Sequence, residues 1–201
     1  MARTQAADYE KRRERIVDCA ARLFAERGFL GASIADLANS CRTSKSLIYH
    51  YYSSKEGILF DVMHSHVKDL LETAEEISGR SVGPAEKLRE MTYAFMQIYL
   101  GAATRQRVLL NELDNLPDDR RKIVVDIQHR LIGIVEKILI EIRPALAGQH
   151  PLRTPGAMLY FGMINWTHTW LNAEGRAKPA EIAELAANIF LQGIDKAVIP
   201  S

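Results

Sequence analysis

Apolar residues recur at intervals of three and four along nearly the whole chain, and this period limits the possible fold more than any other feature. It is the period of helices that bury one face, whereas no segment shows the strict alternation of a half-buried strand. The clearest stripe lies in residues 117–142 and consists of Ile123, Ile127, Leu131, Ile134 and Ile138. The sequence therefore predicts an all-α protein with about nine helices.

The predicted helices are bounded by residues that start or stop helices. Ser33 and Asp36 have the spacing of a capping box, Ser44 is a natural N-cap, and Gly28 suits the left-handed residue that follows a helix. The expected helices cover residues 10–27, 33–40, 44–52, 54–77, 84–98, 105–113, 117–142, 154–172 and 179–198.

The composition is that of a globular chain, with 47% hydrophobic and 25% charged residues. The charged first residues contain no apolar segment of the signal-peptide type, and the most apolar stretch, residues 157–171, is too short to cross a bilayer. We therefore expect a soluble cytoplasmic protein that does not enter membranes. Cys19 and Cys41 are expected to be free thiols in that compartment.

Positive charge is concentrated near the N-terminus. Residues 1–60 hold ten Lys and Arg against seven Asp and Glu, whereas residues 61–201 hold sixteen against eighteen. The basic surplus lies in the same part of the chain as the segment SKSLIYHYY, residues 44–52. This distribution favours a polyanionic partner for the N-terminal third.

The segment SKSLIYHYY has too many polar groups for a core helix and too much aromatic surface for an ordinary surface helix. Two short helices that follow a longer one across a tight turn outline a helix-turn-helix, whose second short helix enters the DNA major groove. The alternative on spacing alone is a plain helical hairpin with exposed tyrosines.

In the helix-turn-helix interpretation, the start of the second short helix faces base edges. Ser44, Lys45, Ser46 and His50 would read bases, because all can donate hydrogen bonds there. Tyr49, Tyr51 and Lys55 would bond phosphates, and the helix start at Ser33 would offer amides to another phosphate.

Five segments carry a resemblance to a known family: IVDCAARLF (16–24), RGF (27–29), SIADLA (33–38), TSKSLIYHYY (43–52) and KEGIL (55–59). Together they resemble the TetR family of one-component bacterial transcription regulators over about a quarter of the chain. The resemblance implies that Tyr49 and Lys55 contact phosphates and that the segment from Thr43 to His50 reads bases.

The turn departs from the family pattern of a small residue, glycine and an apolar residue. This chain has Cys41, Arg42 and Thr43 instead. Arg42 adopts the left-handed conformation less easily than glycine, so either the turn is strained or reshaped, or Arg42 adds a phosphate contact.

Residues 1–57 are thus predicted to form a three-helix DNA-binding domain, and residues 58–201 a larger helical regulatory domain. The resemblance implies that the larger domain binds a small inducer and forms a homodimer through the last two helices. Small residues among large ones in the final helix permit close helix packing. The expected interface residues are Ala183, Ala187, Phe190, Gly193 and Ile194. The alternative is that this helix packs within its own chain.

The helix AMLYFGMINWTHTWL, residues 157–171, is apolar nearly all round and should be buried on most sides. Asn165 and His168 then need partners, which are either a ligand or Tyr99, Tyr160 or a backbone carbonyl. The expected ligand chamber is lined by Met91, Phe95, Tyr99, Leu110, Phe161, Asn165, Trp166 and His168.

This helix is also loosely similar to TetR-family regulators of fatty-acid, steroid or aromatic-acid catabolism, several of which sense CoA thioesters. That similarity makes an acyl-CoA one candidate inducer. Arg105, Arg107 and Arg153 are then candidate partners for CoA phosphates.

The expected function is a ligand-responsive DNA-binding regulator, most simply a repressor that a hydrophobic inducer releases from a palindromic operator. No HExxH, GxSxG, P-loop or CxxC pattern occurs, so no enzyme activity, metal or cofactor is expected. A ligand-independent architectural DNA-binding protein is the first alternative, and a helical enzyme is the second.

Overall fold

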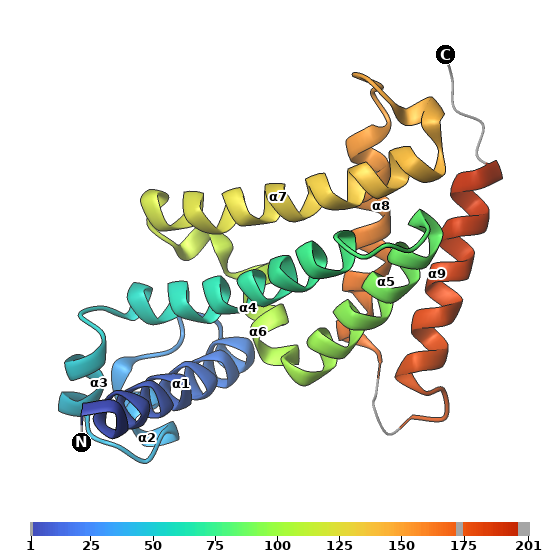
Figure 1. The fold of residues 1–201 in the computed structure, drawn as a ribbon. Coiled ribbons are helices and arrows are strands. Elements are labelled where there is room, and N and C mark those ends of the chain that lie inside the picture. Colours follow the sequence, from blue (N-terminus) through green and yellow to red (C-terminus); the bar gives the residue numbers. More distant parts are fainter. Residues whose placement is uncertain (1, 172–174, 197–201) are drawn as a thin grey trace. The chain divides into compact units, whose positions relative to one another are not determined.

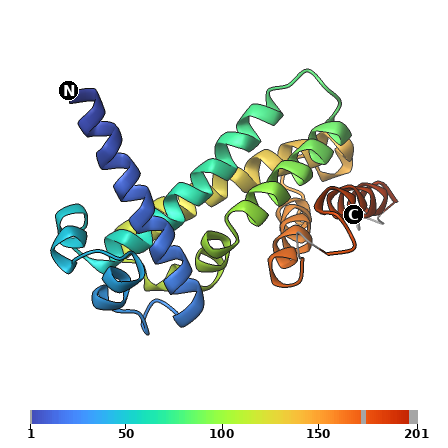
Figure 2. The same cartoon turned by 90° about the horizontal axis from the view of Figure 1, so that it is seen from below.

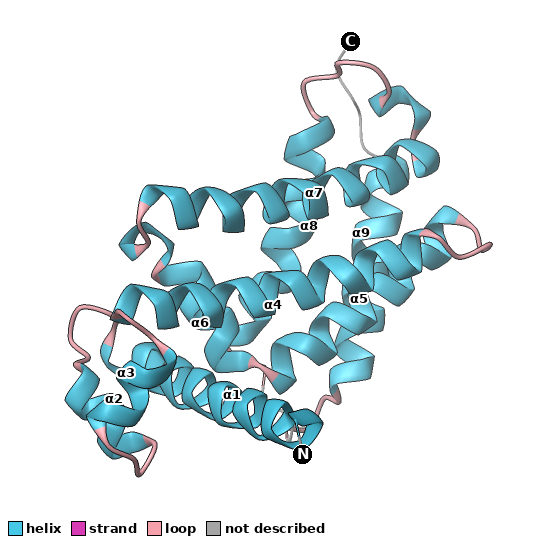
Figure 3. Ribbon diagram, turned by 60° about the vertical axis from the view of Figure 1, so that its left-hand side comes forward, coloured by secondary structure: helices cyan, strands magenta, loops and turns pink. Residues whose placement is uncertain are grey.

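The structure, a computed structural model, describes residues 2–171 and 175–196, and every regular element within these ranges is a helix (Figure 3). The prediction of an all-α protein with about nine helices is confirmed. Within the described ranges the α-helices are α1 (Ala2–Arg27), α2 (Ile34–Ser40), α3 (Lys45–Tyr51), α4 (Lys55–Ser78), α5 (Pro84–Gly101), α6 (Ala103–Asn111), α7 (Asp118–Ile142), α8 (Arg153–Asn165) and α9 (Pro179–Lys196). Short 3-10 turns follow α6, α7 and α8: η1 (Leu113–Asn115), η2 (Pro144–Leu146) and η3 (Trp166–Thr169).

The chain divides into two compact units that do not follow the predicted division at residue 57. The first unit consists of residues 1–67 and 104–125, and the second of residues 68–103 and 126–201. The predicted boundary falls inside α4, and α6 belongs to the first unit. The reason is that α6 bonds to α4 there: the His66 ring contacts the Gln106 amide, with 2.6 Å between Nε2 and Oε1.

In the first unit, α1, α2 and α3 form the expected three-helix head (Figures 1 and 2). Phe24 of α1, Leu37 of α2 and Ile48 of α3 are each at most 1% exposed, so all three helices bury an apolar face. α1 begins eight residues before the expected Glu10, at Ala2. Tyr9 explains part of this extension, because its ring packs on Tyr51 of α3 with 4.6 Å between centroids.

In the second unit, α5 packs mainly against α9 and also against α8. Pro84 opens α5 in the first turn, where its missing N–H has no intrahelical partner to lose. The helix expected over residues 154–172 is α8 followed by the tighter turn η3, and Asn172 lies outside the described residues. The final helix was expected to reach Val198, which also lies outside them. None of the described helices is long and apolar enough to span a membrane.

Candidate nucleic-acid interface and ligand-binding core

The helix α3 shows the local geometry expected of a recognition helix. Ser44 caps it, with its hydroxyl accepting a hydrogen bond from the Leu47 amide at 3.1 Å. Ile48 is fully buried and fixes one face against the head. The opposite face leaves four hydrogen-bonding side chains exposed: Lys45, Ser46, Tyr49 and His50. These groups are available to bases and phosphates of a duplex.

The turn before α3 contains a left-handed arginine. Arg42 has a φ of 53°, and it is the only non-glycine residue with positive φ among those the structure describes. The Thr43 amide donates to the Ala38 carbonyl at 2.9 Å and the Arg42 amide to the Asn39 carbonyl at 3.1 Å. These two bonds are the Schellman arrangement, which places its left-handed residue at the position of Arg42. The turn therefore has the usual backbone shape, with an exposed guanidinium where glycine is ordinary.

The C-terminal end of α3 is held by a buried polar group that sequence reasoning missed. Tyr52 is 8% exposed, and its hydroxyl donates to the Asp61 carboxylate at 2.7 Å. The same carboxylate oxygen accepts from the Arg13 guanidinium at 2.6 Å. Burial, and then the nearby carboxylate, raise the pKa of the Tyr52 phenol, so it stays a neutral donor. One carboxylate of α4 thus connects α1 to the end of α3.

Tyr51 has aromatic neighbours on both sides. Its ring lies 4.6 Å from Tyr9 and 5.3 Å, edge to face, from His50 (centroid to centroid). The contact with Tyr9 was also missed, although Tyr9 lies seven residues before the buried Ile16 and so on the same face of α1. Tyr51, expected as a phosphate contact, therefore also supports the first turns of α1.

Two of the expected phosphate contacts are already bound within the chain. The Ser33 amide donates to the Asp36 carboxylate at 3.0 Å, so the capping box takes one of the amides at the helix start that was expected to meet a phosphate. The Lys55 ammonium donates to the carbonyls of Phe29 and Ala32, at 2.8 Å each. Both expectations stay predictions, because an ammonium has three N–H groups and the start of α2 has further amides.

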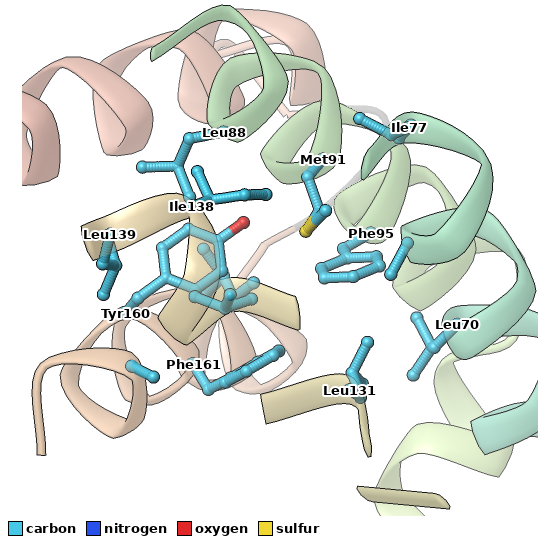
Figure 4. Close-up of a cluster of buried hydrophobic side chains, with 14 of the residues drawn as sticks. Leu70, Ile77, Leu88, Met91, Phe95, Leu131, Ile138, Leu139, Tyr160 and Phe161 are labelled. Carbon is cyan, nitrogen blue, oxygen red and sulfur yellow. The ribbon is translucent and has the colours of Figure 1, made fainter. Parts of the chain in front are cut away.

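The second unit contains a core that includes four of the eight expected ligand-binding residues. Met91, Phe95, Tyr99 and Phe161 are at most 7% exposed, and the rings of Phe95 and Phe161 stack at 6.1 Å. Figure 4 shows Tyr160 and Phe161 opposite Met91 and Phe95.

Polar groups in this core are few and uncharged. The Thr92 hydroxyl donates to the Leu88 carbonyl at 2.7 Å and bonds the Tyr160 hydroxyl at 3.0 Å. Burial raises the pKa of both Tyr99 and Tyr160, so both phenols remain neutral. No charged side chain is buried among the described residues of the second unit.

The other expected ligand-binding residues lie elsewhere. Leu110 is 40% exposed and belongs to the first unit, and Trp166 is 66% exposed. Both expectations are corrected, because neither side chain is enclosed by the core. The His168 Nδ1 lies 2.6 Å from the Asn165 carbonyl. Of the partners expected for His168, a backbone carbonyl is therefore the one present. Asn165 is half-buried at the end of α8.

The three arginines considered for CoA phosphates also differ from one another. Arg105 is 9% exposed and pairs with Glu14 and with Asp18, at 2.8 Å from the latter. Arg153 donates to the Gly148 carbonyl at 2.7 Å and lies 3.2 Å from Glu136. Acidic or carbonyl partners already bind both, which leaves Arg107, exposed on α6, as the remaining candidate.

The small residues of α9 are used inside the chain. Ala183 and Ala187 are each 1% exposed in a single copy, on the helix that packs mainly against α5. Their assignment to a dimer interface is corrected, because no surface is left on them for a partner to cover. Phe190 and Ile194 are half-buried, and Phe190 packs on Tyr160 at 5.3 Å between ring centroids. Gly193 is exposed, with nothing within 4 Å of an added Cβ.

On a different face from Ala183 and Ala187, α9 has exposed large apolar side chains, and so do α8 and the turn after it. On α8 and the turn after it, Leu159, Trp166 and Trp170 are 71%, 66% and 54% exposed. On α9, Leu185 and Ile189 are 54% and 57% exposed and are followed by Gly193 at the same spacing of four. Such concentrated apolar surface is typical of an interaction site.

Comparison with known proteins identifies the family. A model described as bacterial regulatory proteins, tetR family, matches residues 16–62, and one described as tetracyclin repressor-like, C-terminal domain, matches residues 81–194. The transcriptional regulator HbdR of Aromatoleum sp. (strain CIB) is 27% identical over 165 residues, which cover 80% of this chain and 69% of HbdR.

Solved structures agree with this result. A TetR-family transcriptional regulator from Bordetella parapertussis 12822 has a TM-score of 0.88 and 38% identity, and the match covers 94% of this chain and 99% of that one. AibR, solved in complex with isovaleryl coenzyme A and operator DNA, shares the fold with a TM-score of 0.77 at 24% identity, over 89% of this chain and 97% of AibR. These relatives are regulators and not enzymes. The chain belongs to the TetR family of DNA-binding transcriptional regulators.

Proposed function

We propose that this chain is a homodimeric repressor that holds a near-palindromic operator and leaves it when a small, largely apolar inducer binds. The observation that carries the DNA-binding part is the exposed face of α3, capped by Ser44 and anchored at its other end through Tyr52. Two such helices in a dimer would enter major grooves about 34–36 Å apart, one turn of DNA.

The proposed contacts are side chains in and next to α3 that the fold leaves exposed or half-buried. Thr43, Ser44, Lys45, Ser46 and His50 read bases, while Arg42, Tyr49 and Tyr51 meet phosphates. Replacing Lys45 or His50 by alanine should reduce the preference for operator over random DNA, because base contacts carry the sequence information. Equal losses on operator and random DNA would contradict this assignment.

The inducer is proposed to be uncharged in the part that the second unit encloses. The support is the core around Phe95, Phe161 and Tyr160, whose buried polar groups are neutral hydroxyls. Among the described residues, no cation is buried in this unit to pair with an ionised carboxylate enclosed there, and a buried charge without such a partner is strongly destabilised. A thioester or ester carbonyl, in contrast, accepts a hydrogen bond without carrying charge.

A CoA thioester fits this description, because its acyl chain is apolar and its charged part can stay in water. The complex of AibR with isovaleryl coenzyme A is a precedent in a protein of the same fold. To release operator, the inducer must prefer the form that does not bind DNA, and a hundredfold preference corresponds to about 2.7 kcal/mol.

Titration of an operator complex separates these possibilities. The ligands are a series of acyl-CoAs, the matching free acids and the matching methyl esters at pH 7.5. We expect release by the thioesters, weaker release by the methyl esters, and none by the acids. Release by the acids alone would contradict the neutral site, and no release by any member would favour the architectural alternative.

The dimer is proposed to form through the exposed stripes of α8 and α9. The large residues to be covered are Leu159 on α8, Trp166 in the turn η3 that follows it, and Leu185 and Ile189 on α9. Gly162 and Gly193 are exposed on these same helices and permit two copies to approach closely. This proposal keeps Gly193 from the expected interface and replaces Ala183 and Ala187 by exposed apolar residues.

A further inference from the structure

We propose that the first unit contains a small-molecule site of its own, in a cavity between the end of α1 and α6, and that this site binds a free amino acid with an apolar side chain. The cavity has a volume of about 290 Å³. Its lining comes from Phe24 and Ala25 of α1, from Gly28 just after that helix, and from residues 107–112. Every one of these residues belongs to the first unit, so the site is separate from the core proposed to hold the inducer.

The inner wall of the cavity is apolar. Phe24 of α1 and Val108 of α6 are 1% and 0% exposed, so the surface that they present to the cavity is sheltered from bulk water. Ala25 is half-buried beside them and leaves the space open, because its side chain is a single methyl group. An apolar side chain placed against this wall leaves water, which favours binding.

The mouth of the cavity carries one charge of each sign. Arg107 is exposed on α6, and Glu112 is half-buried just after that helix. Within residues 2–171 and 175–196, no ion pair joins these two side chains, and none links Arg107 to another acid. A guanidinium and a carboxylate that line one cavity without pairing match the two charged ends of a zwitterion.

The Glu112 carboxylate has one oxygen bound and the other one open. Oε2 accepts from the Asn115 side-chain amide at 2.7 Å, which fixes the carboxylate. Oε1 faces Gly28, where an added Cβ would lie 3.5 Å from this oxygen. Gly28 has a φ of 74° and no side chain to cover Oε1, so that oxygen can accept a hydrogen bond from an ammonium group.

Size and charge together select the class of ligand. The volume is close to the lower limit of small-molecule sites, about 300 Å³, so the occupant is small. An amino acid with a branched or aromatic side chain offers a carboxylate to Arg107, an ammonium to Glu112 and an apolar group to the wall at Phe24. A fatty acid or an amine would leave one of the two charges at the mouth without a partner.

The test is titration of the ¹⁵N-labelled full chain with L-leucine and L-phenylalanine, followed by amide chemical shifts in NMR spectra. We expect dissociation constants of about 1 mM or below, with the largest shifts in residues 24–28 and 107–112. The matching acids are 4-methylpentanoate and 3-phenylpropanoate, and the matching amines are 3-methylbutylamine and 2-phenylethylamine. Each should bind about tenfold more weakly than its amino acid, because it lacks one of the two charged groups.

Substitutions separate the parts of the site. Arg107→Met and Glu112→Gln should each lower the affinity for both amino acids about tenfold. Arg107→Met should leave the affinity for the amines unchanged, and Glu112→Gln should leave that for the acids unchanged. Ala25→Leu fills the cavity from a half-buried helix position and should abolish binding in a folded protein, as checked by circular dichroism. Arg12→Met is the matched control, since Arg12 is an exposed arginine of α1 outside the cavity.

Other results would overturn the proposal. Acids that bind as tightly as the amino acids would remove Glu112 from the site, and amines that do so would remove Arg107. Shifts caused by coenzyme A but by neither amino acid would assign Arg107 to CoA phosphates. No shift with either amino acid up to about 10 mM, or undiminished binding in Ala25→Leu, would show that the cavity is not an amino-acid site. None of these measurements involves DNA, so this proposal and the regulatory function can fail independently.

Discussion

At Arg42 the left-handed backbone would suit glycine, whereas the exposed guanidinium would suit a DNA phosphate. Relief of the left-handed strain is worth about 1 kcal/mol, so Arg42→Gly should raise the melting temperature by roughly 2–4 °C. It should also weaken binding to operator and random DNA alike, with a smaller salt slope. Calorimetry and binding titrations check the two effects. Gly28→Ala is the reverse control, because Gly28 has a φ of 74° and alanine should lower stability there. If Arg42→Gly bound DNA with unchanged affinity, Arg42 would not contact a phosphate.

The burial of His66 should make the stability of the protein depend on pH. Burial lowers the pKa of its imidazole below the ordinary 6.5, more than the bond to Gln106 raises it, and Arg105 lowers it further. The unfolded chain therefore binds a proton near pH 6.5 that the folded chain does not. Stability should be full above about pH 7 and fall below pH 6.5, by at most about 1.4 kcal/mol per pH unit from this group. Urea unfolding of the parent protein and His66→Gln between pH 5 and 7.5 measures the difference. Parallel pH profiles would contradict a neutral buried His66.

At the scale of elements, α6 is held to the first unit by side chains from one turn. Arg105 pairs with Glu14 and Asp18 of α1 and donates to the Ser65 hydroxyl of α4 at 3.0 Å. Arg105→Met keeps the length of the side chain but removes these bonds, and we expect a loss of about 2 kcal/mol. Arg107→Met, at an exposed position of the same helix, should change stability by less than about 0.5 kcal/mol. Denaturant unfolding of both variants is the measurement. Equal stability of the two would mean that the Arg105 pairs contribute nothing net.

The same helix shows what local sequence patterns can and cannot predict. The caps at Ser33 and Ser44 and the apolar stripes were readable, because they depend on residues within one or two turns of each other. The membership of α6 in the first unit was not, because Arg105 and Glu14 are 91 residues apart. The contacts of Lys55 with two backbone carbonyls were not readable either, because backbone acceptors leave no mark in side-chain patterns.

At the scale of the whole molecule, the sequence predicted an interface on the last two helices, and the α9 residues that it named differ in part from those now proposed. Small residues such as Ala183 suit close helix packing. α9 packs against α5 of its own chain and, in the proposed dimer, also against the partner copy. The pattern alone does not say which face meets which neighbour. The exposed fractions separate them, because Ala183 and Ala187 are covered within one copy whereas Leu185 and Ile189 are not.

This separation leads to a prediction about assembly. The double substitution Leu185→Glu and Ile189→Glu places two like charges where two copies would meet, so the protein should sediment as a folded monomer. In a dimer, two linked recognition helices bind the two half-sites together, which raises operator affinity by about 10² or more over one helix alone. A monomer loses this gain, so its operator affinity should fall by about the same factor. Val82→Glu is the matched control, since Val82 is an exposed apolar residue, at 41%, in the loop before α5. Sedimentation velocity and operator titration of the three proteins decide the question. A double variant that still sediments as a dimer would place the interface elsewhere, and a monomer with full operator affinity would remove the need for a symmetric pair.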